Sequence, residues 1–314
     1  MRVFVTGGSG HLGSSVIPEL LAAGHQVLAL ARSDASAAAL NAAGAEVHRG
    51  SLADLEVLRA AATAADGVVH LAFRHDAMQT GDFAGAVDSD SRAIATISDA
   101  LAGTGKPFVG TSGTLTLAFA GVSGIATEAD TAPGGPRIDA ENAIIALAER
   151  QVRSSVVRLP PTVHSPLDHH GYIPTLIAIA RGKGAAAYVG DGSNRWPAVH
   201  TLDAAQLYRL ALEAAPAGSR LHAVADDGIA FRDIAAAIGR HLDLPVVPVR
   251  PEDAAAHFGF LAAFVALDNP ASSTQTRQLL GWQPAGPGLL ADLDKGHYFS
   301  APTAPTAPPA PAGS

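Results

Sequence analysis

The stretch Val5–Ser15, with the sequence VTGGSGHLGSS, constrains the fold of this chain more than any other feature. It places glycines at positions 7, 10 and 13 directly after the short apolar run Arg2–Val5. The first glycine permits a tight turn, the second lets the backbone approach a pyrophosphate, and the third lets the next helix lie close to the strand. The first turn of that helix offers N–H groups and a positive dipole end to phosphates. The pattern predicts a dinucleotide-binding turn. The alternative is a glycine-rich turn without a ligand.

Short apolar segments alternate with Ala/Leu-rich segments of helical spacing over the first half of the chain. Segments with the composition of buried strands are Arg2–Val5, His25–Ala31, Ala45–Gly50, Gly67–Ala72, Lys106–Ser112 and Ser154–Leu159. Such alternation predicts a parallel sheet covered by helices on both faces. The expected fold class is therefore α/β, a Rossmann-type doubly wound parallel sheet with a smaller C-terminal substrate-binding region.

The pattern changes after Pro160, which suggests three parts. Residues 1–160 are expected to form the dinucleotide-binding domain, and residues 161–300 mainly the substrate-binding region. The apolar segment 221–226 is a candidate strand that returns to the main sheet. Residues 301–314 contain mostly Pro and Ala and have little to bury, so we expect a disordered tail.

Charge and composition exclude several classes of binding partner and of functional site. The chain has 314 residues, a formal charge of −8 and no cysteine. An acidic balance without basic clusters argues against nucleic acid or an anionic membrane surface. The lack of cysteine excludes disulfides, thiolate nucleophiles and Cys-zinc sites. No apolar run approaches the roughly 18 residues that span a bilayer, and no secretory signal is recognisable, so a cytoplasmic protein is expected. The expected partner is a small-molecule substrate, and a homodimer stays open.

The end of the second predicted strand bears on cofactor choice. An NAD-selective site usually carries an acid there to accept the ribose hydroxyls. This chain has Arg32 followed by Ser33, and an arginine can bind the 2′-phosphate of NADP through charge-assisted hydrogen bonds. Ser33 or Asp34 is also a good N-cap for the next helix. NADP(H) is therefore favoured, with NAD(H) as the alternative.

Several further segments recur in the order of a known family. They are TGGSGHLG at the start, Gly50–Leu58, Val68–Phe73, PFVGTSG, Val156–Pro166 and Asn194–Tyr208. With these segments the chain resembles the extended short-chain dehydrogenase/reductase superfamily, in its NAD-dependent epimerase/dehydratase branch. The match covers most of residues 1–215.

The resemblance implies positions for the cofactor and the substrate. Ser51 and Leu52 would lie near the adenine, Ala72 and Phe73 would flank the ribose and phosphates, and Pro160 would approach the nicotinamide. The remaining residues expected around the dinucleotide are Thr6, Gly7, Gly10, His11, Leu12, Gly13, Arg32 and Ser33. Arg195 falls where epimerases often hold a substrate phosphate, and Trp196 is expected in a pocket wall, with packing between the two regions as its alternative.

The catalytic pair of the family does not carry over. The family has Tyr-x-x-x-Lys on the helix before the sixth strand, where the lysine lowers the pKa of the tyrosine. Here Arg137 stands at the tyrosine place and Glu141 at the lysine place, and no tyrosine in the chain has a lysine four residues on. A guanidinium keeps its proton, so Arg137 is expected to bind substrate rather than act as an acid. An exposed Arg137–Glu141 pair is the alternative.

Other side chains are candidates for proton transfer. His164 and Tyr172 follow the strand that should approach the nicotinamide, and histidine titrates near neutrality. We rank His164 or Tyr172 first, then His200, then Ser112 or Thr114 as hydrogen-bond donors. The histidines between positions 164 and 170 could also bind a metal, but their spacing on a loop is easily coincidental, so no metal site is expected.

Three functions remain open at this point. The first is an NADP-dependent reductase of a small carbonyl, imine or enone compound that uses another acid, or water, in place of the tyrosine. The second is a dinucleotide-binding sensor that has lost catalysis. The third is a non-redox isomerase or lyase, because one fold supports many reactions.

Overall fold

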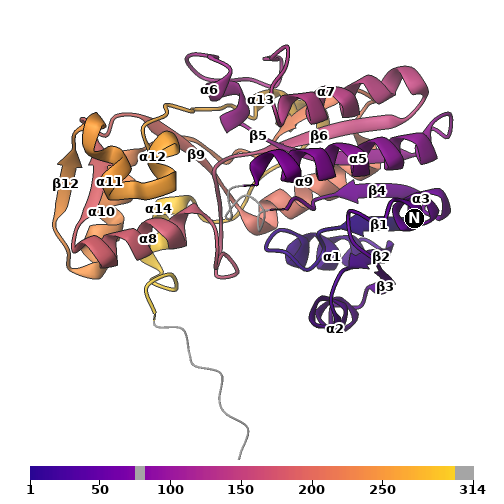
Figure 1. Cartoon of the computed structure of the whole chain (residues 1–314), viewed down its shortest axis with the longest axis horizontal. Coiled ribbons are helices and arrows are strands. Elements are labelled where there is room, and N and C mark those ends of the chain that lie inside the picture. The colour runs from indigo at the N-terminus through magenta and orange to yellow at the C-terminus, as the bar shows by residue number, and fades with distance from the viewer. Residues whose placement is uncertain (75–81, 301–314) are drawn as a thin grey trace, which may run out of the picture.

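The structure is a computed structural model that describes residues 1–74 and 82–300. The predicted disordered tail, 301–314, lies outside the described residues. Figure 1 shows two unequal parts side by side, a larger one built on a wide sheet and a smaller one that contains most of the last third of the chain. Among the described residues, no helix combines the length and the apolar character needed to cross a membrane.

The larger part is a parallel sheet of seven strands in the order β10-β6-β5-β4-β1-β2-β3. Its strands are β1 (Arg2–Thr6), β2 (Gln26–Ala31), β3 (Glu46–Arg49), β4 (Gly67–His70), β5 (Pro107–Gly113), β6 (Arg153–Leu159) and β10 (Ser219–His222). The chain runs outward from β1 to β3, then returns to β4 on the other side of β1. In open α/β sheets a reversal of this kind predicts a ligand-binding crevice at the carboxyl ends of the two strands, here β1 and β4.

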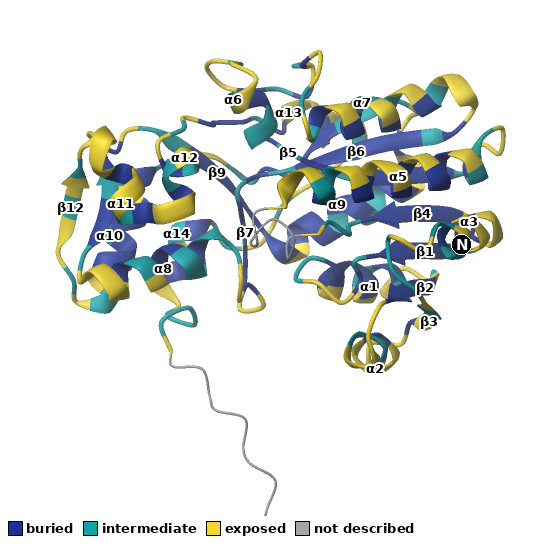
Figure 2. Cartoon of the chain, viewed as in Figure 1, coloured by how far each residue is buried: buried dark blue, intermediate teal, exposed yellow. Residues whose placement is uncertain are grey.

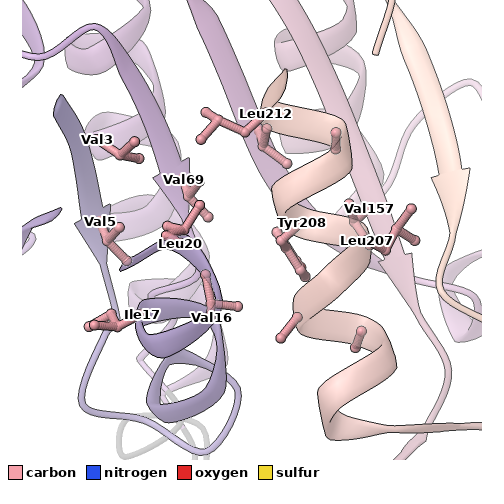
Figure 3. Packing of buried hydrophobic residues seen from close by; sticks show 14 of the residues in the cluster. Val3, Val5, Val16, Ile17, Leu20, Val69, Val157, Leu207, Tyr208 and Leu212 are labelled. Carbon is pink, nitrogen blue, oxygen red and sulfur yellow. The ribbon is translucent and has the colours of Figure 1, made fainter. Parts of the chain in front are cut away.

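Helices cover both faces of this sheet because the strands are apolar on both sides. One face is covered by α3 (Leu55–Ala64), α5 (Phe83–Leu101) and α7 (Ile138–Ala146). The other is covered by α1 (Gly13–Ala22), α2 (Asp34–Ala42) and α9 (Thr201–Ala214). Figure 3 shows Val5 of β1 near Ile17 of α1, Val3 further along the same strand, and Tyr208 on α9. Phe4, between the two valines, joins the opposite core with α3 and α5.

The smaller part has two short sheets and its own core. The sheets have the orders β11-β9-β7 and β12-β8. Their strands are β7 (Thr162–His164), β8 (Ala186–Val189), β9 (Arg195–His200), β11 (Asp226–Ala230) and β12 (Val246–Val249). The helices here are α8 (Tyr172–Lys183), α10 (Phe231–Leu242), α11 (Ala254–Phe258), α12 (Ala262–Val265) and α14 (Leu289–Asp294). Figure 2 shows buried residues on their facing sides.

The predicted strands agree with the structure to within two residues at each end. The segment 221–226 divides, because Ser219–His222 joins the main sheet beside β6 while Asp226 begins β11 of the smaller part. Helix α9 and the short helix α13 (Thr274–Leu280) also pack on the main sheet or its neighbours, although both follow residue 160. The chain therefore crosses between the two parts several times.

Candidate functional site

The turn between β1 and α1 has room for backbone only. Gly7 has a φ of +72°, and a Cβ there would lie 2.7 Å from the Ala72 nitrogen. A Cβ on Gly13 would lie 2.6 Å from the Gly8 Cα and closer still to the Gly7 carbonyl oxygen. Within the described part of the chain, the main-chain N–H groups of His11 and Leu12 donate to no protein acceptor. The turn therefore fits a pyrophosphate, which would accept such donors at the start of a helix.

The end of β2 carries more positive charge than the sequence indicated. Arg32 is exposed there, and Arg49, at the end of the neighbouring β3, stands in register with Ala31. Arg49 donates to the Ser33 carbonyl oxygen at 2.6 Å and to the Asp34 carboxylate at 2.8 Å. Sequence reasoning missed Arg49, because only the strand register brings it to this place.

The hydroxyl group of Ser33 has a structural role. Ser36 donates its main-chain N–H to the Ser33 Oγ at 3.1 Å, and Ser33 donates its own N–H to the Ser36 Oγ at 3.0 Å. This reciprocal pair caps the start of α2, as the N-cap alternative predicted.

The other predicted cofactor residues follow the carboxyl ends of strands. Ser51 and Leu52 follow β3, and the N–H and hydroxyl of Ser51 both donate to the Asp54 carboxylate at 2.8 Å. Ala72 and Phe73 follow β4, and Pro160 follows β6. All these residues lie at the carboxyl ends of the strands, as the glycine turn does.

His11 of the glycine turn contacts the segments that follow β6. Its Nε2 lies 2.8 Å from the Thr201 hydroxyl, and its Nδ1 lies 3.9 Å from the Asp168 carboxylate. Tyr298 donates to the other oxygen of Asp168 at 3.0 Å. Burial raises the pKa of Asp168 and lowers the pKa of His11. His11 thus ties the turn to the C-terminal half of the chain.

A buried polar chain runs from the glycine turn to Arg137. The Thr6 hydroxyl lies 2.8 Å from His70 Nδ1, and His70 Nε2 lies 3.0 Å from one Asp90 oxygen. Arg137 donates to the other Asp90 oxygen at 2.6 Å and to the Thr111 carbonyl oxygen at 2.9 Å. Sequence reasoning missed His70 and Asp90, because they come from different elements, β4 and α5.

The guanidinium of Arg137 lies at the carboxyl ends of β4 and β5. Its central carbon is 4.3 Å from the centre of the Phe73 ring, an arrangement typical of a cation–π contact. The side chain keeps 21% of its surface exposed. Arg137 therefore presents a fixed, partly accessible cation next to the predicted cofactor crevice.

Glu141, at the lysine place, is buried and bonded elsewhere. Arg158 of β6 donates to its carboxylate through Nε and Nη2, and Arg220 of β10 donates at 2.9 Å. Burial acts to raise the pKa of Glu141, but the hydrogen bonds and charge of Arg158 outweigh it and lower the pKa. The expected exposed Arg137–Glu141 pair was wrong, because each side chain has a buried partner in another element.

The two histidines predicted for proton transfer are the last residues of β7 and β9, which pair side by side. His164 is fully buried and donates from Nδ1 to Asp292 at 2.9 Å. Its ring centre lies 5.5 Å from that of His200, whose Nδ1 accepts from the Leu202 N–H at the start of α9. Burial, with the nearby His164, lowers the pKa of His200. The catalytic role predicted for His164 does not fit this placement, because its ring has no surface that a substrate could reach.

Ser112 and Thr114 are also buried. Ser112 on β5 stands in register with Arg158 on β6, and Thr114 accepts from the Asn269 amide at 3.0 Å. Arg195 is partly exposed. Its Nε and Nη2 donate to the two carboxylate oxygens of Asp268 at 3.0 and 2.8 Å, in a bidentate ion pair.

Trp196 was expected in a pocket wall, but it is fully buried in the core of the smaller part. Its ring packs against Phe231, with centres 4.9 Å apart, and against Tyr172, with centres 5.5 Å apart. The pocket role was wrong because the rings of Phe231 and Tyr172 and the rest of this core cover Trp196. Tyr172 also contacts Phe264, which in turn contacts Phe119 of helix α6 (Leu115–Phe119), just after β5.

No group of three or more His, Asp or Glu side chains in residues 1–74 and 82–300 is arranged to hold a metal ion. The described site thus consists of the glycine turn, the arginines near β2 and β3, and the polar chain that ends at Arg137.

This fold and turn define a dinucleotide-binding α/β protein, and comparison with known proteins gives its family. The model of the NAD dependent epimerase/dehydratase family matches residues 3–224. The chain belongs to this family, whose members bind NAD(P). The resemblance inferred from the sequence is confirmed.

Three similar proteins cover between 70% and 95% of this chain. An uncharacterized protein of Schizosaccharomyces pombe is 45% identical over 299 residues, which cover 95% of this chain and 100% of that protein. The 2-alkyl-3-oxoalkanoate reductase of Stenotrophomonas maltophilia is 31% identical over 231 residues, which cover 70% of this chain and 67% of the reductase. The crystal structure of DesIV, a dTDP-glucose 4,6-dehydratase from Streptomyces venezuelae, superposes with a TM-score of 0.73 at 20% identity, covering 94% of this chain and 96% of DesIV. That likeness confirms the predicted fold class.

Proposed function

We propose that this protein is an NADP(H)-dependent reductase that acts on a small carbonyl, imine or enone compound without the Tyr/Lys pair of its family. One observation carries the proposal: the glycine turn and the fixed guanidinium of Arg137 both lie at the carboxyl ends of the central strands of the sheet. A phosphate cradle and a donor for a substrate oxygen thus share one crevice. When bound, the nicotinamide cofactor supplies the hydride.

The arginines near β2 and β3 support a preference for NADP(H). Arg32 and Arg49 place two positive charges where the 2′-phosphate would lie. Arg49 also pairs with Asp34, the carboxylate that would otherwise repel that phosphate. The N–H groups of His11 and Leu12 would hold the pyrophosphate.

Arg137 takes over the electrophilic part of the missing tyrosine's role. It stays charged at any working pH, so it donates hydrogen bonds to a substrate oxygen and stabilises negative charge there. It does not release a proton, which must come from another group.

Tyr172 is the proton donor that we retain from the sequence candidates. It is half-buried, and its aromatic contacts run through Phe264 to Phe119, which follows β5. Burial raises the pKa of Tyr172 to about 12, so the phenol holds its proton at neutral pH. An alkoxide formed by hydride transfer is the stronger base and would accept that proton.

The relative from Stenotrophomonas maltophilia supports ketone reduction, since its name describes it as a reductase of 2-alkyl-3-oxoalkanoates. The test is a panel of carbonyl, imine and enone compounds incubated with the protein and NADPH, followed at the nicotinamide absorbance. We expect oxidation of NADPH with at least one ketone. Cofactor binding by calorimetry without oxidation by any compound would overturn the proposal.

A second candidate, a dinucleotide-binding sensor, is favoured by the burial of Glu141 at the lysine place. A sensor would bind NADPH in the same panel and leave every compound unchanged. An isomerase or lyase would convert a compound, seen by chromatography, with no net change in nicotinamide absorbance.

A further inference from the structure

Within residues 1–74 and 82–300, Arg137 has hydrogen-bond donors that bind no protein acceptor and are left for a ligand. A guanidinium carries five N–H groups, and the bonds to Asp90 and to the Thr111 carbonyl use two of them. The Phe73 ring covers one face of the guanidinium plane. The side chain keeps 21% of its surface exposed, so its remaining N–H groups are open to a ligand, and a planar guanidinium matches the geometry of a carboxylate.

Asp90 and His70 fix this guanidinium in place. Asp90 is 3% exposed, and a carboxylate only accepts, so His70 Nε2 carries the proton of their 3.0 Å bond. His70 Nδ1 lies 2.8 Å from the Thr6 hydroxyl, which accepts the Ala72 N–H at 3.3 Å. The polar side-chain atoms of Thr6, His70 and Asp90 thus all have hydrogen-bond partners. A buried carboxylate needs its partner cation, so Asp90 keeps Arg137 from turning into solvent.

The order Thr6–His70–Asp90 resembles that of a hydrolytic triad, but Thr6 cannot serve as its nucleophile. Thr6 is fully buried, so no substrate can reach its hydroxyl group. The functional group of this hydrogen-bonded series is therefore Arg137, at the end opposite Thr6.

We propose that Arg137 binds a carboxylate group of the substrate, and that Asp90 and His70 are its positioning residues. The inference rests on the proposed reductase function and names its substrate class as oxo acids, ketones that also carry a carboxylate. A monoanion fits better than a phosphate, because Asp90 already offsets part of the single positive charge at this point. The other arginine considered for a substrate phosphate, Arg195, is paired with Asp268.

The experiment compares 3-oxobutanoate with its methyl ester as substrates of the full chain, because the ester keeps the ketone and loses the charge. We expect the wild type to have a KM at least about tenfold lower for the acid, as charge-assisted hydrogen bonds imply. Arg137→Gln should abolish this preference, and added guanidinium should restore part of it. Asp90→Asn should raise the KM of the acid more than that of the ester, because the acid loses a positioned partner for its carboxylate as well as for its ketone oxygen.

Two controls separate binding from folding. Arg150→Gln removes an exposed arginine paired with Asp99 and should keep the preference for the acid. The double variant Arg137→Gln/Asp90→Asn leaves no buried unpaired carboxylate, so it should fold even if a single variant does not. It should treat acid and ester alike. Retention of the preference for the acid in Arg137→Gln or in the double variant would overturn the inference.

A binding measurement distinguishes this inference from the proposed function. Butanoate and butanamide, neither of which is a ketone, are titrated onto the protein and followed by tryptophan fluorescence. Butanoate binding that Arg137→Gln abolishes, with no reduction of any ketone, would support the carboxylate site and count against the reductase. Reduction of acid and ester with equal KM, and no binding of butanoate, would support the reductase and overturn the carboxylate site.

Discussion

Arg158 binds Glu141 inside the protein, at the place where the family carries its catalytic lysine. The two side chains are 1% and 3% exposed, and Arg220 adds a second cation on the same carboxylate. His222 accepts a further hydrogen bond from Arg158 at 3.2 Å. A charge of opposite sign has thus replaced the lysine, and the surroundings hold it with two arginines.

This arrangement predicts that Glu141→Lys does not restore the family's site. The new ammonium would be buried beside Arg158 and Arg220, without a carboxylate for either. Breaking a buried pair costs about 3–5 kcal/mol, and like charges add to the loss. We expect a lower free energy of unfolding in urea. Glu149→Lys, on the exposed surface of the same segment, is the control and should change little. A Glu141→Lys variant as stable as the wild type would contradict the buried pair.

Gly13→Ala should weaken cofactor binding. Its Cβ would meet the backbone of Gly7 and Gly8, and overpacking of this kind costs about 1–3 kcal/mol. We expect a loss of NADPH affinity of about tenfold or more by calorimetry. Gly182→Ala is the matched control, because a Cβ there meets nothing within 4 Å. Equal affinity of the two variants would mean that the turn does not hold the pyrophosphate.

Arg49→Ala should weaken NADPH binding and leave NADH binding nearly unchanged. A hydrogen bond to a charged group contributes about 1.5–3 kcal/mol, so we expect a loss of tenfold or more in NADPH affinity alone. Arg32→Ala should act in the same direction. Arg59→Ala, on the surface of α3, serves as the charge control. Wild-type protein that binds both cofactors equally in calorimetry would refute the predicted NADP(H) preference.

Tyr172→Phe should lower kcat about a hundredfold, the usual contribution of a positioned general acid, without changing cofactor affinity. Because burial raises its pKa to about 12, the rate should show no loss of this acid across neutral pH. Tyr188→Phe, half-buried on β8, is the control. Full activity of Tyr172→Phe would assign the proton to water.

His222 should make the protein less stable in mild acid. Burial, with the charge of Arg158 second, lowers its pKa from 6.5 to about 4. Between these pH values the unfolded chain binds a proton that the native protein does not, so the free energy of unfolding falls as the pH falls through this window. The loss is on the order of 3 kcal/mol at roughly 1.4 kcal/mol per unit. His222→Gln keeps a donor and an acceptor and should flatten the profile in urea titrations. An unchanged profile would assign the acid sensitivity to other groups.

The sequence by itself determined the fold and the cofactor turn. Glycines at 7, 10 and 13 after a short apolar run have a local physical cause, because the turn needs their backbone freedom and lack of Cβ. The alternation of apolar strands and amphipathic helices is also a local signal, because the polarity of each residue indicates whether it is buried. The N-cap at Ser33 was predictable for the same reason.

Only the tertiary structure decided what the polar residues do. Arg137 binds Asp90 of another helix, and Glu141 binds Arg158 of a strand. His164 binds Asp292, which comes 128 residues later in the sequence. Trp196 is in the core, because helices from distant parts of the chain close over it. A charged or aromatic side chain takes its role from the partners and the solvent access around it, and strand order and helix packing fix both.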